Sequence, residues 1–156
     1  MMTSLCCEVL GKLQGKTLVT AESLTGGGIG TALTAVPGSS EVYKGGVISY
    51  TNWVKETVLQ VPSQILENCG AVSGECAGLM ASGVRQLLKA DVALSVTGLA
   101  GPGGDDYGNP VGTVFIGYED DQRSAVNHYV FSGTREEVRN QTIEAALQMV
   151  LKYQNN

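Results

Sequence analysis

The chain has 156 residues and a mass of 16.3 kDa, so we expect one domain over residues 1–156 with its own hydrophobic core. Its 43% hydrophobic and 16% charged residues exclude intrinsic disorder, and no apolar run approaches the ~20 residues of a membrane span. The net charge of −5, the pI near 4.8 and the lack of a basic run argue against direct nucleic-acid binding.

The N-terminal residues and the cysteines indicate where the protein works. The first residues carry no basic stretch, and Glu8 interrupts their apolar run, so we expect no signal peptide. The four cysteines lack the spacing of a zinc site and are expected to be free thiols. The only histidine, His128, alternates with apolar strand residues and is expected at the surface or in a sheet. We therefore predict a cytoplasmic protein without a metal or an organic cofactor.

A glycine-rich loop follows the first predicted strand. Residues 3–14 have the apolar spacing of an amphipathic helix, and residues 17–21 read as a strand. The loop ESLTGGG then leads into a helical pattern. A loop at a helix N-terminus suits an anion, because the first backbone N–H groups of a helix are unpaired. The candidate phosphate-binding residues here are Thr25, Gly26 and Gly27, with a simple helix-packing turn as the alternative.

The segment PGSSEVYKGGVISYTNWVK, residues 37–55, concentrates the reactive side chains. Its apolar residues 47–50 predict a short buried strand, and the pattern becomes helical from Thr51, a good N-cap. Lys55 would lie in or just beyond the first turn of that helix. The helix dipole and partial burial would both lower the pKa of a lysine there, which suits a general base.

A serine hydroxyl needs a neighbouring base to act as a nucleophile, and Ser40, Tyr50 and Lys55 can form such a group. The alternative is structural: Ser40 caps a turn, Tyr50 has its hydroxyl at the surface, and Lys55 is solvated. Ser39 and Ser23 are competing serines.

The second half of the chain repeats the pattern of strand and glycine loop. A short helix at 62–68 and a longer helix at 73–89 precede the apolar strand VALSV. This strand ends in TGLAGPGG, and glycine loops at the carboxyl ends of parallel strands often hold ligands. The candidate binding residues of this loop are Thr97, Gly98 and Gly101.

A hairpin and a last helix complete the chain. The alternating segments 113–118 and 124–131 predict an antiparallel hairpin, and Thr134 with Glu137 forms the signature of a capping box before a long helix. Arg135 and Arg139 lie one turn apart on this helix, either solvated or as a phosphate clamp. Strand–helix alternation followed by a hairpin predicts a three-layer α/β/α sandwich with a mixed, mainly parallel sheet.

Six motifs, in their order and spacing, resemble the C-terminal domain of the CinA (competence/damage-inducible) family over nearly the whole chain. They are TAESLTGGGIG, PGSSEVYKGGVISYTNWVK, GAVS, TGLAGPGG, NPVGTV and FSGTREEVRNQ. Stand-alone members of that family are nicotinamide mononucleotide deamidases. The resemblance implies hydrolysis of the nicotinamide carboxamide to nicotinic acid mononucleotide and ammonia, a step of pyridine nucleotide salvage.

The resemblance also implies roles for individual residues. Its serine, tyrosine and lysine fall on Ser40, Tyr50 and Lys55, which would act by acyl transfer. Backbone N–H groups near Ser39 or the Asn52 amide would stabilise the oxyanion. A glycine loop would bind the phosphate, together with Arg139.

Two further readings and one expectation about assembly complete the analysis. The chain could be a catalytically weak nucleotide-binding or regulatory member of the family, which the intact Ser40, Tyr50 and Lys55 disfavour. A role in DNA uptake or damage response is suggested by the family name alone. We expect a homodimer or higher homo-oligomer, because small α/β domains commonly form symmetric oligomers.

Overall fold

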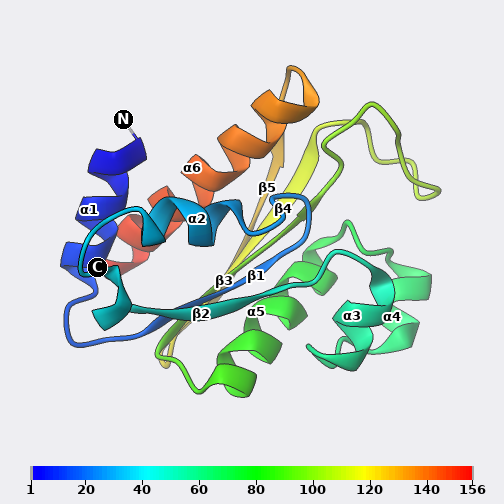
Figure 1. Ribbon diagram of the computed structural model, residues 1–156. Coiled ribbons are helices and arrows are strands. Elements are labelled where there is room, and N and C mark those ends of the chain that lie inside the picture. Colours follow the sequence, from blue (N-terminus) through cyan, green and yellow to red (C-terminus); the bar gives the residue numbers. More distant parts are fainter. Residues whose placement is uncertain (1, 156) are drawn as a thin grey trace.

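The computed structural model describes residues 2–155 and folds them into a five-stranded sheet between two helical layers (Figure 1). The strands are β1 (Leu18–Glu22), β2 (Tyr43–Ile48), β3 (Val92–Gly98), β4 (Thr113–Glu119) and β5 (Ser124–Val130). The helices are α1 (Met2–Lys12), α2 (Gly28–Thr34), α3 (Asn52–Thr57), α4 (Ser63–Asn68), α5 (Gly74–Leu88) and α6 (Arg135–Gln154), with a short 3₁₀ turn, η1 (Ser39–Glu41). The predicted α/β sandwich is confirmed.

The sheet is parallel in its core and antiparallel at one side. Its strand order is β2-β1-β3-β4-β5, with β1 parallel to both β2 and β3, while β4 is antiparallel to β3 and to β5. The predicted hairpin is therefore β4–β5. Parallel alignment brings the carboxyl ends of β1, β2 and β3 to the same edge of the sheet, where ligands commonly bind in such folds.

Each face of the sheet has its own core. Helices α1, α2 and α6 cover one face, and α5 with α3 and α4 covers the other (Figure 1). Strand β1 is buried along its whole length, as expected for a strand packed on both faces. Helix α6 begins with the predicted capping box between Thr134 and Glu137. None of the helices between residues 2 and 155 is long and apolar enough to cross a membrane.

Strand β2 begins four residues earlier than the sequence predicts. The predicted strand covered residues 47–50, whereas the observed strand runs from Tyr43 and includes Gly45 and Gly46. A Cβ on Gly46 would lie 2.5 Å from Thr20 Oγ1 and 2.9 Å from the Thr20 carbonyl oxygen. Glycine is therefore the residue that lets β2 approach β1 at this point.

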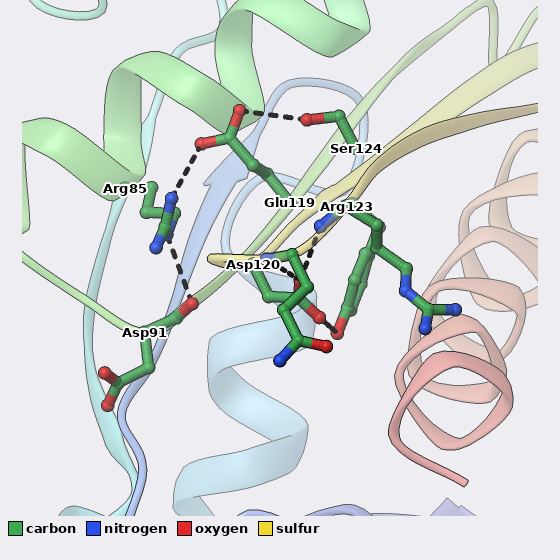
Figure 2. A network of polar contacts seen from close by, with 8 residues as sticks. Arg85, Asp91, Glu119, Asp120, Arg123 and Ser124 are labelled. Carbon is green, nitrogen blue, oxygen red and sulfur yellow. Dashed lines mark hydrogen bonds and ion pairs between the residues drawn. The ribbon is translucent and has the colours of Figure 1, made fainter. Parts of the chain in front are cut away.

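A polar network closes the β4–β5 end of the sheet (Figure 2). Arg85 of α5 forms a 3.4 Å ion pair with Glu119 and donates a hydrogen bond to the Asp91 carbonyl oxygen. Ser124 donates to the other oxygen of Glu119, while Asp120 accepts two backbone N–H groups of the hairpin turn. Every acceptor of this network has a protein donor, so we assign it a structural role.

Candidate active site

A cleft of about 420 Å³ lies at the carboxyl ends of β1, β2 and β3. It is lined by the residues after each of these strands, by the start of α3 and by one arginine of α6. The lining residues that bear on the chemistry are Ser23, Tyr50, Asn52, Lys55, Thr97 and Arg135. A cleft of this size falls within the range of small-molecule sites in proteins.

Lys55 is the central charged group of the cleft, and its side chain is only 1% exposed. Its Nζ donates hydrogen bonds to the Ser23 hydroxyl at 3.1 Å, the Ser49 carbonyl oxygen at 2.7 Å and the Tyr50 carbonyl oxygen at 3.3 Å. Burial lowers the pKa of Lys55, and the nearby Cys76 thiol opposes this only in part. A buried lysine with a lowered pKa carries a larger neutral fraction near neutral pH, and the neutral amine is a base.

Ser23 is the serine that contacts this base. It directly follows β1, and its backbone N–H donates to the Val96 carbonyl oxygen at 3.1 Å, which fixes the residue beside β3. Its hydroxyl is buried against Lys55 at the wall of the cleft. A serine hydroxyl within hydrogen-bond reach of a lysine whose pKa is lowered has the geometry of a nucleophile beside a general base.

Ser40 does not reach Lys55, so the predicted grouping of Ser40, Tyr50 and Lys55 does not form. Ser40 lies exposed in η1, before β2, whereas Tyr50 and Lys55 follow the same strand. A strand rises about 3.3 Å per residue, so β2 separates the two groups by roughly 17 Å. Figure 1 shows the cyan segment before β2 and helix α3 at opposite ends of that strand. Ser39 lies in the same distant turn.

The loop of Ser23 is held by a buried glutamate. Glu22 is 2% exposed, and its carboxylate accepts hydrogen bonds from the backbone N–H groups of Ile29 and Gly30 at 2.8 and 3.0 Å. The Thr25 and Thr20 hydroxyls donate to it at 2.6 and 3.1 Å. Glu22 thus ties the strand before Ser23 to the first turn of α2 after it.

The expectation that Thr25, Gly26 and Gly27 bind a phosphate stays a prediction, and Thr25 and Gly26 line a separate cavity of about 1140 Å³ together with Arg135 and Arg139. Two N–H groups in the first turn of α2, those of Ile29 and Gly30, already donate to Glu22, and Thr25 is buried with its hydroxyl on the same carboxylate. None of these three loop residues lines the cleft with Lys55. The Glu22 carboxylate thus holds the first glycine loop against the start of α2.

The two arginines of α6 have different positions. Arg139 donates from Nε to the Leu24 carbonyl oxygen and from Nη2 to the Thr25 carbonyl oxygen, so it holds the Ser23 loop from behind. Arg135 reaches the cleft, where Nη1 donates to the Gly101 carbonyl oxygen at 2.7 Å and Nη2 to the Tyr50 hydroxyl at 3.3 Å. Of the two arginines, only Arg135 lines the cleft with Lys55.

The remaining predicted residues lie around the same cleft. Asn52, Thr97, Gly98 and Gly101 all line it. The hydroxyl of Thr97 donates to the Ala71 carbonyl oxygen at 2.8 Å and is therefore already engaged. The predicted N-cap of α3 is confirmed, since the Thr51 side chain accepts from the Val54 N–H. The second glycine loop is thus part of the site, and the first one supports it.

A family model for the CinA C-terminal domain matches residues 3–154 of this chain. The chain belongs to the CinA C-terminal domain family. A CinA-like protein of Desulfotalea psychrophila is 46% identical over 140 residues, which cover 90% of this chain and 34% of that protein. A putative competence-damage inducible protein of Caldanaerobacter subterraneus is 42% identical over 152 residues, covering 97% of this chain and 37% of the relative. The chain thus spans about a third of the length of these curated relatives.

Solved CinA structures have the same fold as this domain. The competence damage-inducible protein A (ComA) from Klebsiella pneumoniae superimposes with a TM-score of 0.94 at 35% identity, covering 97% of this chain and 95% of the other. The competence/damage inducible protein CihA from Agrobacterium tumefaciens gives a TM-score of 0.91 at 36% identity, covering 99% and 96%. The expected family resemblance is therefore confirmed.

A positional signal in the CinA domain could have identified Ser23. It follows β1, Tyr50 follows β2, and Thr97 is the second-last residue of β3, so all three reach one edge of the parallel part of the sheet. Ser40 is closer to Lys55 in sequence, and that closeness favoured a serine that the fold places away from Lys55.

Proposed function

We propose that this protein is an amidohydrolase that converts nicotinamide mononucleotide and water to nicotinic acid mononucleotide and ammonia, a step of pyridine nucleotide salvage. The observation that carries the proposal is the 3.1 Å contact between Lys55 Nζ and Ser23 Oγ at the wall of an open cleft. A serine paired with a lysine base is a recurring arrangement in enzymes that transfer acyl groups. The choice of substrate rests on the motif resemblance to stand-alone members of the family.

The proposed first half-reaction forms an acyl-enzyme. Neutral Lys55 accepts the Ser23 proton as the serine Oγ attacks the carboxamide carbon, which gives a tetrahedral oxyanion. Lys55 then transfers that proton to the amide nitrogen, the C–N bond breaks, and ammonia leaves. Asn52 lines the same cleft, and its side-chain amide is the candidate hydrogen-bond donor to the oxyanion.

The second half-reaction releases the acid. Lys55 accepts a proton from water, the hydroxide attacks the Ser23 ester, and the proton returns to Ser23 Oγ as the ester bond breaks. Tyr50, whose hydroxyl accepts from Arg135, is the additional group available for proton transfer at the mouth of the cleft. The reaction needs no metal or organic cofactor, because the nucleophile and the base are both side chains.

Arg135 is the proposed phosphate ligand. Its guanidinium lines the cleft beside the 97–104 loop, and it carries a full positive charge in a protein of net charge −5. Arginine binds phosphate oxygens through paired N–H donors. We therefore assign phosphate binding to Arg135 and the Thr97–Gly101 loop, and a supporting role to Arg139.

The proposal is tested by ammonia release from nicotinamide mononucleotide, with a chelator present and the Lys55→Met variant measured beside the wild type. Release by the wild type that is lost in the variant supports a metal-independent serine–lysine amidohydrolase. If the wild type releases no ammonia but its melting temperature rises with the mononucleotide, the chain is a nucleotide-binding member that lacks the activity. The absence of both effects refutes the proposed substrate.

A further inference from the structure

The connection between β3 and β4 is a long loop that is closed at its base. Leu99 donates its N–H to the Thr113 carbonyl oxygen at 2.9 Å, and Gly112 donates its N–H to the Leu99 carbonyl oxygen at 2.8 Å. Residues 100–111 extend beyond these bonds without helix or strand, and Figure 1 shows them as the yellow-green loop that projects past the sheet. Loops of about 12 residues without secondary structure are uncommon in compact domains and usually have a function.

The first part of this loop is a wall of the cleft that packing fixes only weakly. All residues from 97 to 104 line the cleft. A Cβ on Gly103 or Gly104 would meet no heavy atom within 4 Å outside the neighbouring residues, so close packing does not hold either glycine. Glycine also loses more backbone freedom than any other residue when it is ordered. The position of this wall therefore depends on contacts on either side of the two glycines.

Arg135 makes the contact on the first side of the glycines. Its Nη1 donates to the Gly101 carbonyl oxygen at 2.7 Å, and its Nη2 donates to the Tyr50 hydroxyl at 3.3 Å. Arg135 also lines the cleft itself. A shift of Gly101 would therefore also change the position of Arg135, which is the proposed phosphate ligand.

Tyr107 makes the contact on the second side. Its hydroxyl donates to the Glu67 carbonyl oxygen at 2.7 Å and lies 3.1 Å from the Leu66 carbonyl oxygen, both in the last turn of α4. Its ring lies against Gly70, where an added Cβ would come within 2.8 Å of a ring carbon. The residue is still 48% exposed, so burial of the ring stabilises this contact only in part, and the hydroxyl adds a specific attachment.

The turn that carries Tyr107 is itself fixed by Asp105 and Asn109. The Asp105 carboxylate accepts the backbone N–H groups of Tyr107 and Asn109 at 3.1 and 3.2 Å, and it accepts the Asn109 side-chain amide at 2.8 Å. The same amide donates to the Val72 carbonyl oxygen at 3.2 Å, and Val72 lines the cleft. The loop is thus attached at two points to residues 66–72, the segment that links α4 to α5.

We propose that Tyr107 is a positioning residue for substrate binding. Its bond to the end of α4 holds the wall formed by residues 97–104, and through Gly101 it holds Arg135, where they bind the substrate phosphate. The inference rests on the proposed function, which supplies the substrate and its phosphate. Tyr107 does not line the cleft, so it acts through the loop. Ser23 and Lys55 are held by bonds to β3 and to the end of β2 instead, so the chemical step should not depend on Tyr107.

The kinetics of ammonia release from nicotinamide mononucleotide test this role. Tyr107→Phe removes the attaching hydroxyl and should raise KM about three- to tenfold, while kcat stays within about twofold of the wild type. Tyr107→Ala also removes the ring and should raise KM further. The matched control is Tyr153→Phe, which makes the same change on α6 outside the cleft and should keep the wild-type KM. A wild-type KM in both Tyr107 variants, or a fall in kcat at unchanged KM, overturns the proposal.

Hydrogen exchange measured by NMR tests the attachment without relying on the reaction. The amides of Tyr107 and Asn109, which donate to Asp105, should exchange about two- to tenfold faster in Tyr107→Phe than in the wild type, and at the wild-type rate in Tyr153→Phe. Equal exchange in the wild type and Tyr107→Phe overturns the proposal, whatever the activity. If exchange is faster in Tyr107→Phe but the wild type neither releases ammonia nor binds nicotinamide mononucleotide, the proposed function fails and the attachment by Tyr107 stands.

Discussion

Replacing Glu22 by Gln tests how the loop of the proposed nucleophile is held. The Glu22 carboxylate is buried and accepts two backbone N–H groups, from Ile29 and Gly30, and two threonine hydroxyls. A glutamine keeps one acceptor oxygen and presents an NH₂ group in place of the other. We therefore expect Glu22→Gln to destabilise the fold and to disturb the position of Ser23.

The cost follows from the donors that lose their acceptor. A threonine hydroxyl facing the new NH₂ can rotate and accept from it, but the backbone N–H beside it cannot. A buried donor left without a partner costs about 1–3 kcal/mol. The hydrogen bonds that remain are weaker, because their acceptor is no longer a charged carboxylate, and this costs about 1 kcal/mol more. The expected loss in the free energy of unfolding is thus about 2–4 kcal/mol.

Urea denaturation measures this loss, with Glu41→Gln as the matched control because Glu41 is an exposed carboxylate in η1. The control should change the free energy of unfolding by less than about 0.5 kcal/mol. Under conditions where Glu22→Gln is folded, its kcat should fall while KM stays near the wild-type value, because Ser23 moves and the phosphate site does not. A loss no larger than that of the control would refute the role of Glu22 as an internal anchor.

Three further predictions concern Lys55, Arg135 and Ser49. The wild-type rate of ammonia release should rise with pH as Lys55 loses its proton. The midpoint of this rise should lie below the ordinary lysine pKa, because burial lowers the pKa of Lys55. A pH–rate profile that stays flat would show that Lys55 is not the base. Arg135→Gln should raise KM by about tenfold or more, because a charged hydrogen bond to the phosphate, worth ~1.5–3 kcal/mol, is lost. The control His128→Gln should leave KM unchanged. Equal KM values in the two variants would contradict phosphate binding by Arg135. Ser49→Ala should leave the free energy of unfolding unchanged or raise it by up to about 1 kcal/mol, measured by urea denaturation. The reason is that the Ser49 hydroxyl is buried without a hydrogen-bond partner among residues 2–155. A clear decrease in the free energy of unfolding would indicate a partner for that hydroxyl.

Local sequence signals predicted most of the elements. The capping box at Thr134 located the start of α6, and the continuous apolar run VALSV located β3. These signals depend on neighbours along the chain, so one sequence is enough to read them. The start of β2 was missed because Gly46 is required by the approach of Thr20 on another strand, which no local pattern reports.

The site was predicted in part for the same reason. Lys55 and Tyr50 were identified from their own segment, and their place beside the cleft is observed. The contact between Lys55 and Ser23 spans 32 residues of sequence and depends on the parallel pairing of β1 with β2. Ser40 is nearer along the chain, but a whole strand separates it from Lys55. The role of Glu22 was also missed, since its carboxylate joins residues of β1 and α2 that only the fold brings together.

The most direct test of the account compares Ser23→Ala with Ser40→Ala in ammonia release from nicotinamide mononucleotide. Each variant removes one serine hydroxyl, at Ser23 after β1 or at Ser40 before β2, so the two substitutions make the same chemical change at different places in the sheet. We expect Ser23→Ala to abolish turnover while mononucleotide binding stays within a few fold, and Ser40→Ala to retain wild-type activity. Activity retained by Ser23→Ala, or lost only in Ser40→Ala, would contradict the assignment of Ser23 and Lys55 as nucleophile and base.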